Sequence, residues 1–269
     1  MATVLPGVNR VRATAWITAG ADGQLPRLRS QAPLVLRPTQ DAVYLVSAAG
    51  GPVGGDVLDL RIEVRTGAAL RLRTVAASVA LPGVDGAESV LAVHASVASG
   101  GVLEYLPEPM VVADRSRHTT DIQVDLASGA SLVLRDEVIL GRHGESGGAC
   151  RTRLRCDYDG RPLLRHDVVV DGADEVSLGP AVLAGHRAYG TVLRAGESTG
   201  DPAASDAHAT ASPIRRGAPG TSRARPDVAV MPLAGPGVLV SVLAADSLAL
   251  RRLLDACGRR GVPDRTACP

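Results

Sequence analysis

The sequence predicts a mainly β protein made of stacked layers of strands, of solenoid or sandwich type, with a short helix near the C-terminus. Three features predict it: apolar and charged residues alternate over long stretches, glycines punctuate those stretches, and one glycine-plus-strand pattern recurs. A chain of 269 residues can bury one large core, and we expect a single domain over residues 1–269. Val, Leu and Ala must fill that core, because the chain has no Phe and one Trp.

The first clear strand is predicted over residues 57–65. Apolar residues alternate there with charged ones, and a period of two is typical of a strand with one buried face. The residues expected to face the core are Leu58, Leu60, Ile62 and Val64. Further strands are expected over residues 43–46, 70–73, 151–155 and 238–243.

A glycine, a small residue and then a strand recur three times, at intervals of about 30 residues. The copies are Gly67-Ala68-Ala69-Leu70-Arg71-Leu72, Gly100-Gly101-Val102-Leu103-Glu104-Tyr105 and Gly129-Ala130-Ser131-Leu132-Val133-Leu134. Short strands at such intervals favour layers in which each repeat covers the apolar face of its neighbour. An ordinary β-sandwich with glycine turns is the alternative.

Two segments depart from the β pattern. Residues 196–226 are rich in Gly, Pro, Ser, Ala and Asp, which predicts a flexible loop whose arginines are solvated or, alternatively, touch an acidic partner. A helix is predicted over residues 246–258, with Asp246 or Ser247 as its N-cap and Gly258 near its end. Its apolar stripe would dock on the domain itself or, if the β body already covers itself, serve a partner. That stripe consists of Leu248, Leu250, Leu253 and Leu254, and the polar side and end carry Arg251, Arg252, Arg259 and Arg260.

Composition and charge exclude several classes of function. All 29 basic residues are arginine, so mechanisms that need a lysine amine, including a Schiff base and a Walker A phosphate loop, are excluded. The formal net charge of +1 gives no overall field for nucleic acid or an anionic membrane. No long apolar run and no signal peptide are found, so we expect a soluble cytoplasmic protein.

Cysteine and histidine spacing signals no preformed metal site. Cys150, Cys156, Cys257 and Cys268 form no C-x-x-C pair, and we expect ordinary reduced thiols. The six histidines are scattered, with no H-x-x-x-H pair. His143 with Glu145 is at most a weak, transient site for a divalent ion, and a surface contact is the alternative.

Two glycine-rich segments resemble catalytic loops. Gly50-Gly51-Pro52-Val53-Gly54-Gly55-Asp56 looks like a phosphate loop, but the next segment is a strand and not a helix, so we expect a tight turn in which Asp56 caps backbone amides. Gly144-Glu145-Ser146-Gly147-Gly148 matches the G-x-S-x-G pattern, and a serine hydrolase that uses Ser146 is therefore the alternative function. A strand rather than a helix is expected after it, which weighs against that alternative.

Three blocks, taken together, point to a family. They are Gly50-Gly51-x-x-Gly54-Gly55-Asp56, Leu103-Glu104-Tyr105-Leu106-Pro107-Glu108-Pro109-Met110 and Gly141-Arg142-His143-Gly144-Glu145. In this order they resemble the urease accessory protein family UreD, called UreH in some bacteria, over about residues 10–255. The family-like positions are Gly50, Gly51, Gly54, Gly55, Asp56, Glu104, Tyr105, Pro107, Pro109, Gly141, Arg142, Gly144 and Glu145.

The resemblance implies a non-catalytic scaffold with a β-helix-like, or β-solenoid, body and a short helical element near the C-terminus. It implies that the protein binds apo-urease, recruits UreF and UreG and takes part in nickel insertion, and it allows a dimer within the accessory complex. GTP hydrolysis would belong to UreG, and no cofactor would be tightly bound. Ser146 would then lie in a structural turn rather than in a nucleophile elbow.

A protein that passes nickel on must hold the ion weakly, which carboxylates, carbonyls and water do and a thiolate cage does not. By that criterion Asp56, Glu104, Glu137 and Glu145 are candidates for a transient nickel path. Only Asp56, Glu104 and Glu145 lie in the family-like blocks. For each of them a backbone cap or a salt bridge is the alternative role.

Overall fold

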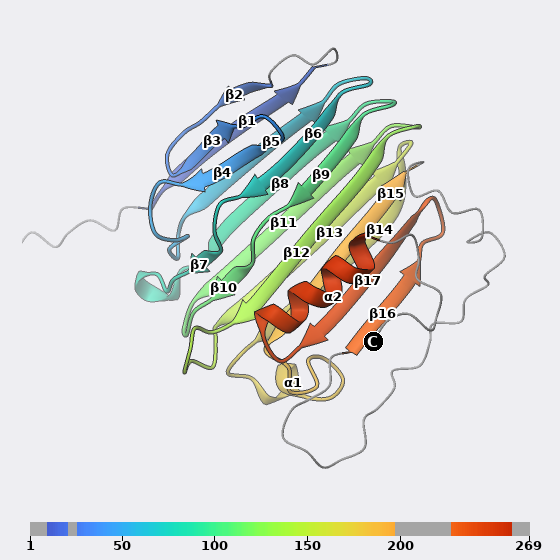
Figure 1. Ribbon diagram of the computed structural model, residues 1–269. Helices are drawn as coiled ribbons and strands as arrows, with labels where there is room; N and C mark the ends of the chain where they lie inside the picture. Colours follow the sequence, from blue (N-terminus) through green and yellow to red (C-terminus); the bar gives the residue numbers. More distant parts are fainter. Residues whose placement is uncertain (1–9, 21–25, 197–226, 260–269) are drawn as a thin grey trace, which may run out of the picture.

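Two β-sheets lie face to face and enclose the main core in the computed structural model, which describes residues 10–20, 26–196 and 227–259 (Figure 1). The first sheet contains, in spatial order, β14 (Arg161–Asp171), β13 (Ala149–Tyr158), β11 (Arg117–Leu126), β8 (Ser89–Val97), β5 (Val57–Val64), β1 (Arg12–Ala19) and β2 (Arg27–Arg29). The second contains β16 (Asp227–Pro232), β17 (Gly237–Ala244), β15 (Ala188–Gly196), β12 (Ser131–Leu140), β9 (Val102–Leu106), β6 (Ala69–Thr74), β4 (Val43–Ser47) and β3 (Leu34–Pro38). Two short strands, β7 (Ser78–Ala80) and β10 (Met110–Val112), pair with each other, and β10 also pairs with β12.

The chain winds between the two sheets, and this confirms the solenoid-like stack. From β5 to β13 successive long strands alternate between the first and the second sheet, and like strands of successive turns pair in parallel. The margins are different. β2, β3, β14 and β15 each pair antiparallel with the parallel series, so the parallel interior is bounded by antiparallel strands at both ends of both sheets.

The three predicted repeats stack in register. Leu70, Leu103 and Leu132 are direct partners on β6, β9 and β12, and all three are buried. The turns that precede them contain Gly67, Gly100 and Gly129, which have φ angles of 68°, 69° and 78°. An L-residue with a side chain rarely adopts that region, and glycine does so without a steric penalty.

β5 and β13 of the first sheet bury alternate residues, as the alternation in their sequences predicted. On β5 the residues Leu58, Leu60, Ile62 and Val64 point into the core, and their charged neighbours point outward. The interior is almost free of rings and is packed with Leu, Val and Ala.

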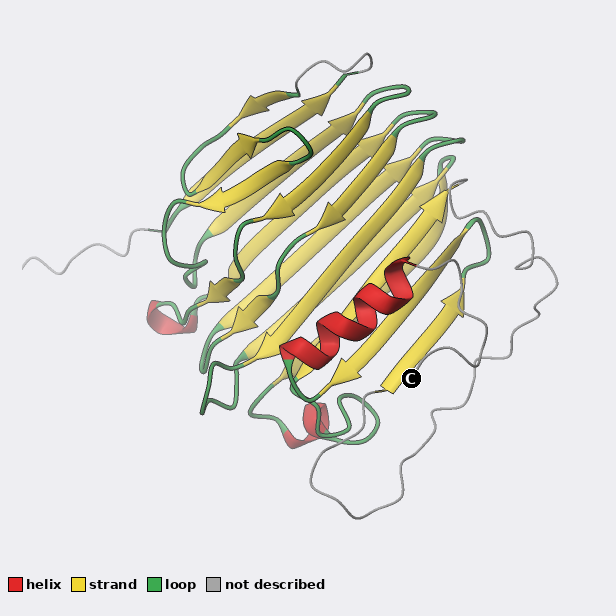
Figure 2. Ribbon diagram, in the orientation of Figure 1, coloured by secondary structure: helices red, strands yellow, loops and turns green. Residues whose placement is uncertain are grey.

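The predicted C-terminal helix is α2 (Ser247–Arg259), and it lies over β15 and β17 of the second sheet (Figure 2). Asp246 caps it, since its Oδ1 accepts a hydrogen bond of 2.8 Å from the amide of Ala249. Leu250, Leu253 and Leu254 are buried against the sheet, so the stripe docks on this chain and is not left for a partner. The prediction was wrong for Leu248, which is 59% exposed, and for Arg251, which reaches into a buried ionic cluster rather than into solvent.

The remaining elements are short. They are the single-turn helix α1 (Glu175–Leu178) and the 3₁₀ turn η1 (Val84–Gly86), both in connections between strands. The loop predicted over residues 196–226 lies outside the described residues from residue 197 onward, as do its arginines. Among the described residues no helix is long and apolar enough to cross a membrane.

Candidate functional site

Asp56 caps the backbone of the glycine-rich turn between β4 and β5, as the sequence predicted. Its Oδ1 accepts a hydrogen bond of 2.9 Å from the amide of Val11, and its Oδ2 accepts one of 2.9 Å from the amide of Val53. The carboxylate is buried, and both of its oxygens are engaged. Asp56 therefore ties this turn to the chain that enters β1.

The glycines of this turn serve close packing. Gly51 and Gly55 have φ angles of 141° and 100°. A Cβ on Gly54 would lie 2.2 Å from the carbonyl oxygen of Ala87 and 2.5 Å from the amide nitrogen of Gly83. The loop that contains Gly83 and Ala87 therefore packs directly against Gly54. The turn is followed by the strand β5, whereas a phosphate loop would be followed by a helix.

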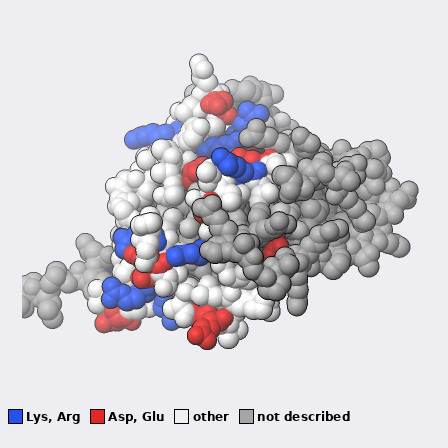
Figure 3. All heavy atoms as spheres, turned by 60° about the horizontal axis from the view of Figure 1, so that its bottom comes forward, with Lys and Arg blue, Asp and Glu red and all other residues white. Residues whose placement is uncertain are grey.

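Glu145 holds together the turn between β12 and β13. Its carboxylate pairs with the guanidinium of Arg142 and accepts hydrogen bonds from the amides of Arg142, at 3.0 Å, and Asp114, at 3.2 Å. These contacts, the Arg142 side chain above all, lower the pKa of Glu145 to about 2. On the face that Figure 3 shows, basic and acidic side chains lie beside one another rather than in a field of one sign.

Ser146 lies exposed in that same turn. The turn connects two strands, whereas a nucleophile elbow connects a strand to a helix. A serine hydrolase also needs a histidine base, and His118, one of the six histidines, is buried and bonded elsewhere. Its Nδ1 lies 2.9 Å from the hydroxyl of Ser89, and its Nε2 lies 3.1 Å from that of Thr120. The geometry contradicts the hydrolase interpretation.

Glu104 and Tyr105 point to opposite faces of β9. Glu104 is on the outer face of the second sheet and pairs with Arg73 of β6. Tyr105 is buried in the core, and desolvation raises the pKa of its phenol. Pro107 and Pro109 follow in the segment between β9 and β10, where the strand is interrupted.

This interruption in the second sheet lies opposite three consecutive charged residues. β12 pairs with β9 as far as Leu134 and with β10 from Val138 onward, so Arg135, Asp136 and Glu137 have no strand partner on that side. Two prolines remove backbone donors from the interrupted segment. All three charged residues are nevertheless buried.

On the outer face, the interruption is covered by an ionic cluster that includes α2. Glu137, 2% exposed, has its Oε1 at 2.7 Å from Nε of Arg135 and at 2.7 Å from Nε of Arg251. Arg251 also holds Glu108 through two hydrogen bonds of 3.0 Å, and Nη1 of Arg135 lies 3.0 Å from Oδ1 of Asp255. Burial raises the pKa of Glu137 although both guanidinium groups oppose the shift. Hydrogen bonds from Arg251 lower the pKa of Glu108.

On the inner face, Asp136 points into the space between the two sheets. Desolvation and the neighbouring Glu137 raise its pKa to about 7, while a hydrogen bond with Thr152 of β13 opposes the shift. The hydroxyl of Thr152 in turn lies 3.1 Å from that of Tyr189, which is on β15. A small polar region is therefore enclosed between the two sheets.

The structure does not bring the predicted nickel contacts together. Asp56, Glu104 and Glu145 lie in three separate places, and each has its own hydrogen-bond or ion-pair partner. Within the described ranges, no three side chains of His, Cys, Asp and Glu gather as a metal site would require. Cys150 and Cys156 are buried free thiols with pKa values raised to about 12 by burial, while the side chains of Cys257 and Cys268 lie outside the description.

The interrupted part of β12 was largely missed in the sequence, although Glu137 was a candidate. One signal was available: residues 135–137 place three charges inside an otherwise apolar run from Val133 to Leu140. A charged triplet in a strand that is buried on both faces must be paired.

A surface groove of about 530 Å³ adjoins the ionic cluster. Its floor is formed by Val79, Val111 and Ile139, which are partners in register on β7, β10 and β12. Leu248 and Arg251 of α2 line it as well. The groove thus joins the second and third family-like blocks, through Pro109 and through Gly141 with Arg142.

Comparison with known proteins agrees with these blocks. The model of the UreD urease accessory protein family matches residues 12–268. The chain is 41% identical to urease accessory protein UreD of Streptomyces coelicolor, over 95% of this chain and 97% of the relative. It is 42% identical to UreD 3 of Streptomyces griseus, over 93% and 96%, and 41% identical to UreD of Parafrankia sp., over 93% and 89%. The chain therefore belongs to the UreD family of urease accessory proteins.

Proposed function

We propose that this protein is a urease maturation chaperone of the cytoplasm, which binds apo-urease and recruits UreF and UreG for nickel insertion. The observation that carries the proposal is the match of the UreD family model to residues 12–268. As a member of an accessory family the chain is not an enzyme. A dimer within the accessory complex belongs to the same proposal.

The composition supports the assignment of nucleotide hydrolysis to another component of this assembly. The chain has no lysine, and its glycine-rich turn leads into a strand, so nucleotide hydrolysis falls to a partner such as UreG. The solenoid contributes large exposed sheet faces and the groove beside α2, which are surfaces for partners rather than for substrates.

A transient polar path for nickel is part of the proposal. Asp56, Glu104 and Glu145 remain its proposed contacts, and the enclosed Asp136 adds a carboxyl group between the sheets. Oxygen donors of this kind release a borderline divalent ion readily. Replacing Asp56 and Glu145 together by Ala is expected to lower the nickel content of urease while the complex still forms. Loss of the complex would assign both residues to structural roles.

Co-expression with the urease subunits and the other accessory proteins tests the function itself. At limiting nickel, urease made with this chain should contain nickel and be active, and urease made without it should be largely metal-free. The chain should also co-purify with the urease subunits and a UreF-like protein. Full nickel loading of urease in the absence of this chain would refute the proposal.

A further inference from the structure

The outer face of the first sheet carries an exposed tryptophan. Ala13, Ala15 and Ile17 of β1 point into the core, which places Trp16 on the opposite face, where it is 40% exposed. It is the single tryptophan of the chain. α2 packs on β15 and β17 of the second sheet, and no described helix packs on this face (Figure 1).

Arginines flank Trp16 on both sides. Arg29 of β2 and Arg61 of β5 are its direct partners in register, so their side chains lie in the same row of the sheet. Neighbouring strands are about 4.8 Å apart, which brings the indole ring within reach of both guanidinium groups. Arg12 lies on the same face of β1, and Arg27 pairs with Thr18 across the β1–β2 ladder.

Positive charge is concentrated at the end of the stack that contains β1 and β2. The described residues up to position 75 include nine arginines and four carboxylates, although the whole chain has a net charge of only +1. Arg61 is paired with Asp59 at 2.9 Å and Arg65 with Glu63 at 3.2 Å. Arg12, Arg27 and Arg29 make no ion pair with any described carboxylate.

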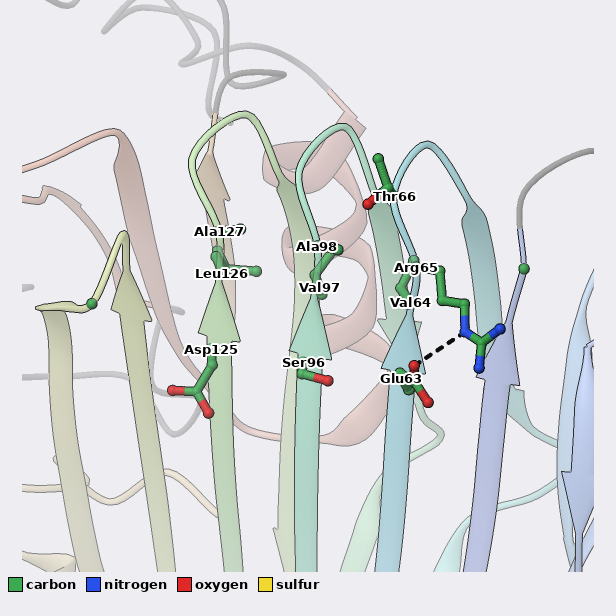
Figure 4. Close-up of a pocket in the computed structure, with 12 residues that line it drawn as sticks. Glu63, Val64, Arg65, Thr66, Ser96, Val97, Ala98, Asp125, Leu126 and Ala127 are labelled. Carbon is green, nitrogen blue, oxygen red and sulfur yellow. Dashed lines mark hydrogen bonds and ion pairs between the residues drawn. The ribbon is translucent and has the colours of Figure 1, made fainter.

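Acidic side chains limit this positive region on the same face. A hollow of about 970 Å³ beside it is lined by Glu63, Ser96 and Asp125, which occupy one row across β5, β8 and β11 (Figure 4). Carboxylates in this position would repel the phosphates of a nucleic acid that crossed the sheet. A protein surface can instead match a short positive region bordered by a negative one.

We propose that Trp16, Arg12, Arg27 and Arg29, together the Trp16 patch, dock an acidic surface of a partner protein. Tryptophan and arginine are among the residues that most often dominate protein interfaces, because the indole ring buries a large area and the guanidinium group supplies charged donors. The inference rests on the proposed function, since the partner is a component of the urease maturation assembly. It adds to that function the surface of this chain that binds the partner and the negative charge of the partner's surface.

Oxidative footprinting of the assembled complex tests the inference. The chain is co-expressed with the urease subunits and the other accessory proteins, and hydroxyl radicals are applied to the purified complex and to the free chain. Since Trp16 is the single tryptophan of this chain, oxidised tryptophan in the peptides of this chain reports one position. We expect oxidation at Trp16 to fall at least about threefold in the complex, as for a side chain that becomes fully buried.

A charge-matched pair of variants separates the patch from charge in general. Arg27→Gln with Arg29→Gln should weaken partner binding by roughly tenfold and restore oxidation of Trp16. Arg37→Gln with Arg71→Gln removes the same charge from exposed positions on the second sheet. This control variant should change neither partner binding nor the protection of Trp16 from oxidation. The urea midpoints of both variants verify that they fold.

Several results would overturn the inference. Equal oxidation of Trp16 in the free chain and in a nickel-loading complex would contradict the patch and leave the proposed function intact. Protection of Trp16 by self-association, or by an added single-stranded oligonucleotide, would assign the patch to a second copy or to nucleic acid instead. Equal effects of the two variants would also contradict it. Failure to form any complex would refute the proposed function, and this inference with it.

Discussion

Arg251 of α2 and Glu137 of β12 form a buried ion pair, with 2.7 Å between Nε and Oε1. The pair joins the C-terminal helix to the one stretch of β12 that has no strand partner on its β9 side. The helix is therefore held by charge as well as by its leucines.

Removing Arg251 should loosen α2. Arg251→Ala leaves Glu137 with Arg135 alone and leaves Glu108 without its two hydrogen bonds, so we expect a loss of roughly 2 kcal/mol in the free energy of unfolding. Urea denaturation measures it. The control is the exposed neighbour Arg252→Ala, for which a change within about 0.5 kcal/mol is expected. Equal effects of the two substitutions would show that the ion pair contributes nothing.

Asp136 should make stability fall as the pH rises. Its pKa is raised from 3.8 to about 7 in the folded protein, so between these values the folded state holds a proton that the unfolded state has lost. The stabilisation that comes from this higher pKa is fully present below about pH 4 and is lost as the pH rises to about 7.

Asp136→Asn should remove that dependence. The variant is expected to be more stable than the natural protein at pH 8, by at most roughly 4 kcal/mol, and the difference should shrink towards pH 4. Urea denaturation across this pH range provides the measurement. A difference that does not vary with pH would mean that Asp136 titrates normally.

Gly54 should not tolerate a side chain. Gly54→Ala places Cβ 2.2 Å from a backbone oxygen of the next loop, and backbone atoms cannot move aside cheaply, so a loss of roughly 3 kcal/mol is expected. Gly50→Ala is the matched control in the same turn, because no atom lies within 4 Å of its Cβ position. Thermal unfolding measures the stability of both variants. A lower unfolding temperature for Gly50→Ala than for Gly54→Ala would contradict the close contact between these two loops.

Ser146→Ala should leave urease activation unchanged, since Ser146 is an exposed turn residue. The adjacent Gly147→Ala should instead destabilise the protein, because Gly147 has a φ angle of 97° and its Cβ would lie 2.7 Å from the amide of Gly141. Co-expression with urease and measurement of its nickel content compare the two. Loss of activation in a folded Ser146→Ala variant would contradict a purely structural turn.

Local patterns in the sequence predicted the features that depend on neighbouring residues. The alternation around Leu60 and the glycines at 67, 100 and 129 each reflect a local backbone requirement, and both were confirmed. The capping role of Asp56 was also predictable, because a short acidic side chain in a turn accepts hydrogen bonds from nearby backbone amides.

Long-range contacts were beyond local patterns. Arg251 was assigned to the polar side of its helix, since nothing in its own segment reveals a buried carboxylate 114 positions earlier in the chain, at Glu137. The prediction for Leu248 was wrong for the same reason: its place in the apolar stripe is a local feature, but the groove that it lines is formed by strands far away in the sequence. The separation of Asp56, Glu104 and Glu145 likewise depends on how far the turns of the stack lie from one another.

The change from parallel to antiparallel pairing at both margins has a consequence for the size of such a protein. Each inner turn offers the next one the same ladder, so nothing in the repeat itself specifies how many turns there are. A strand that pairs in the opposite direction cannot be followed by another turn of the same kind. β2 and β3 at one margin, and β14 and β15 at the other, therefore act as terminators that set the length of the stack.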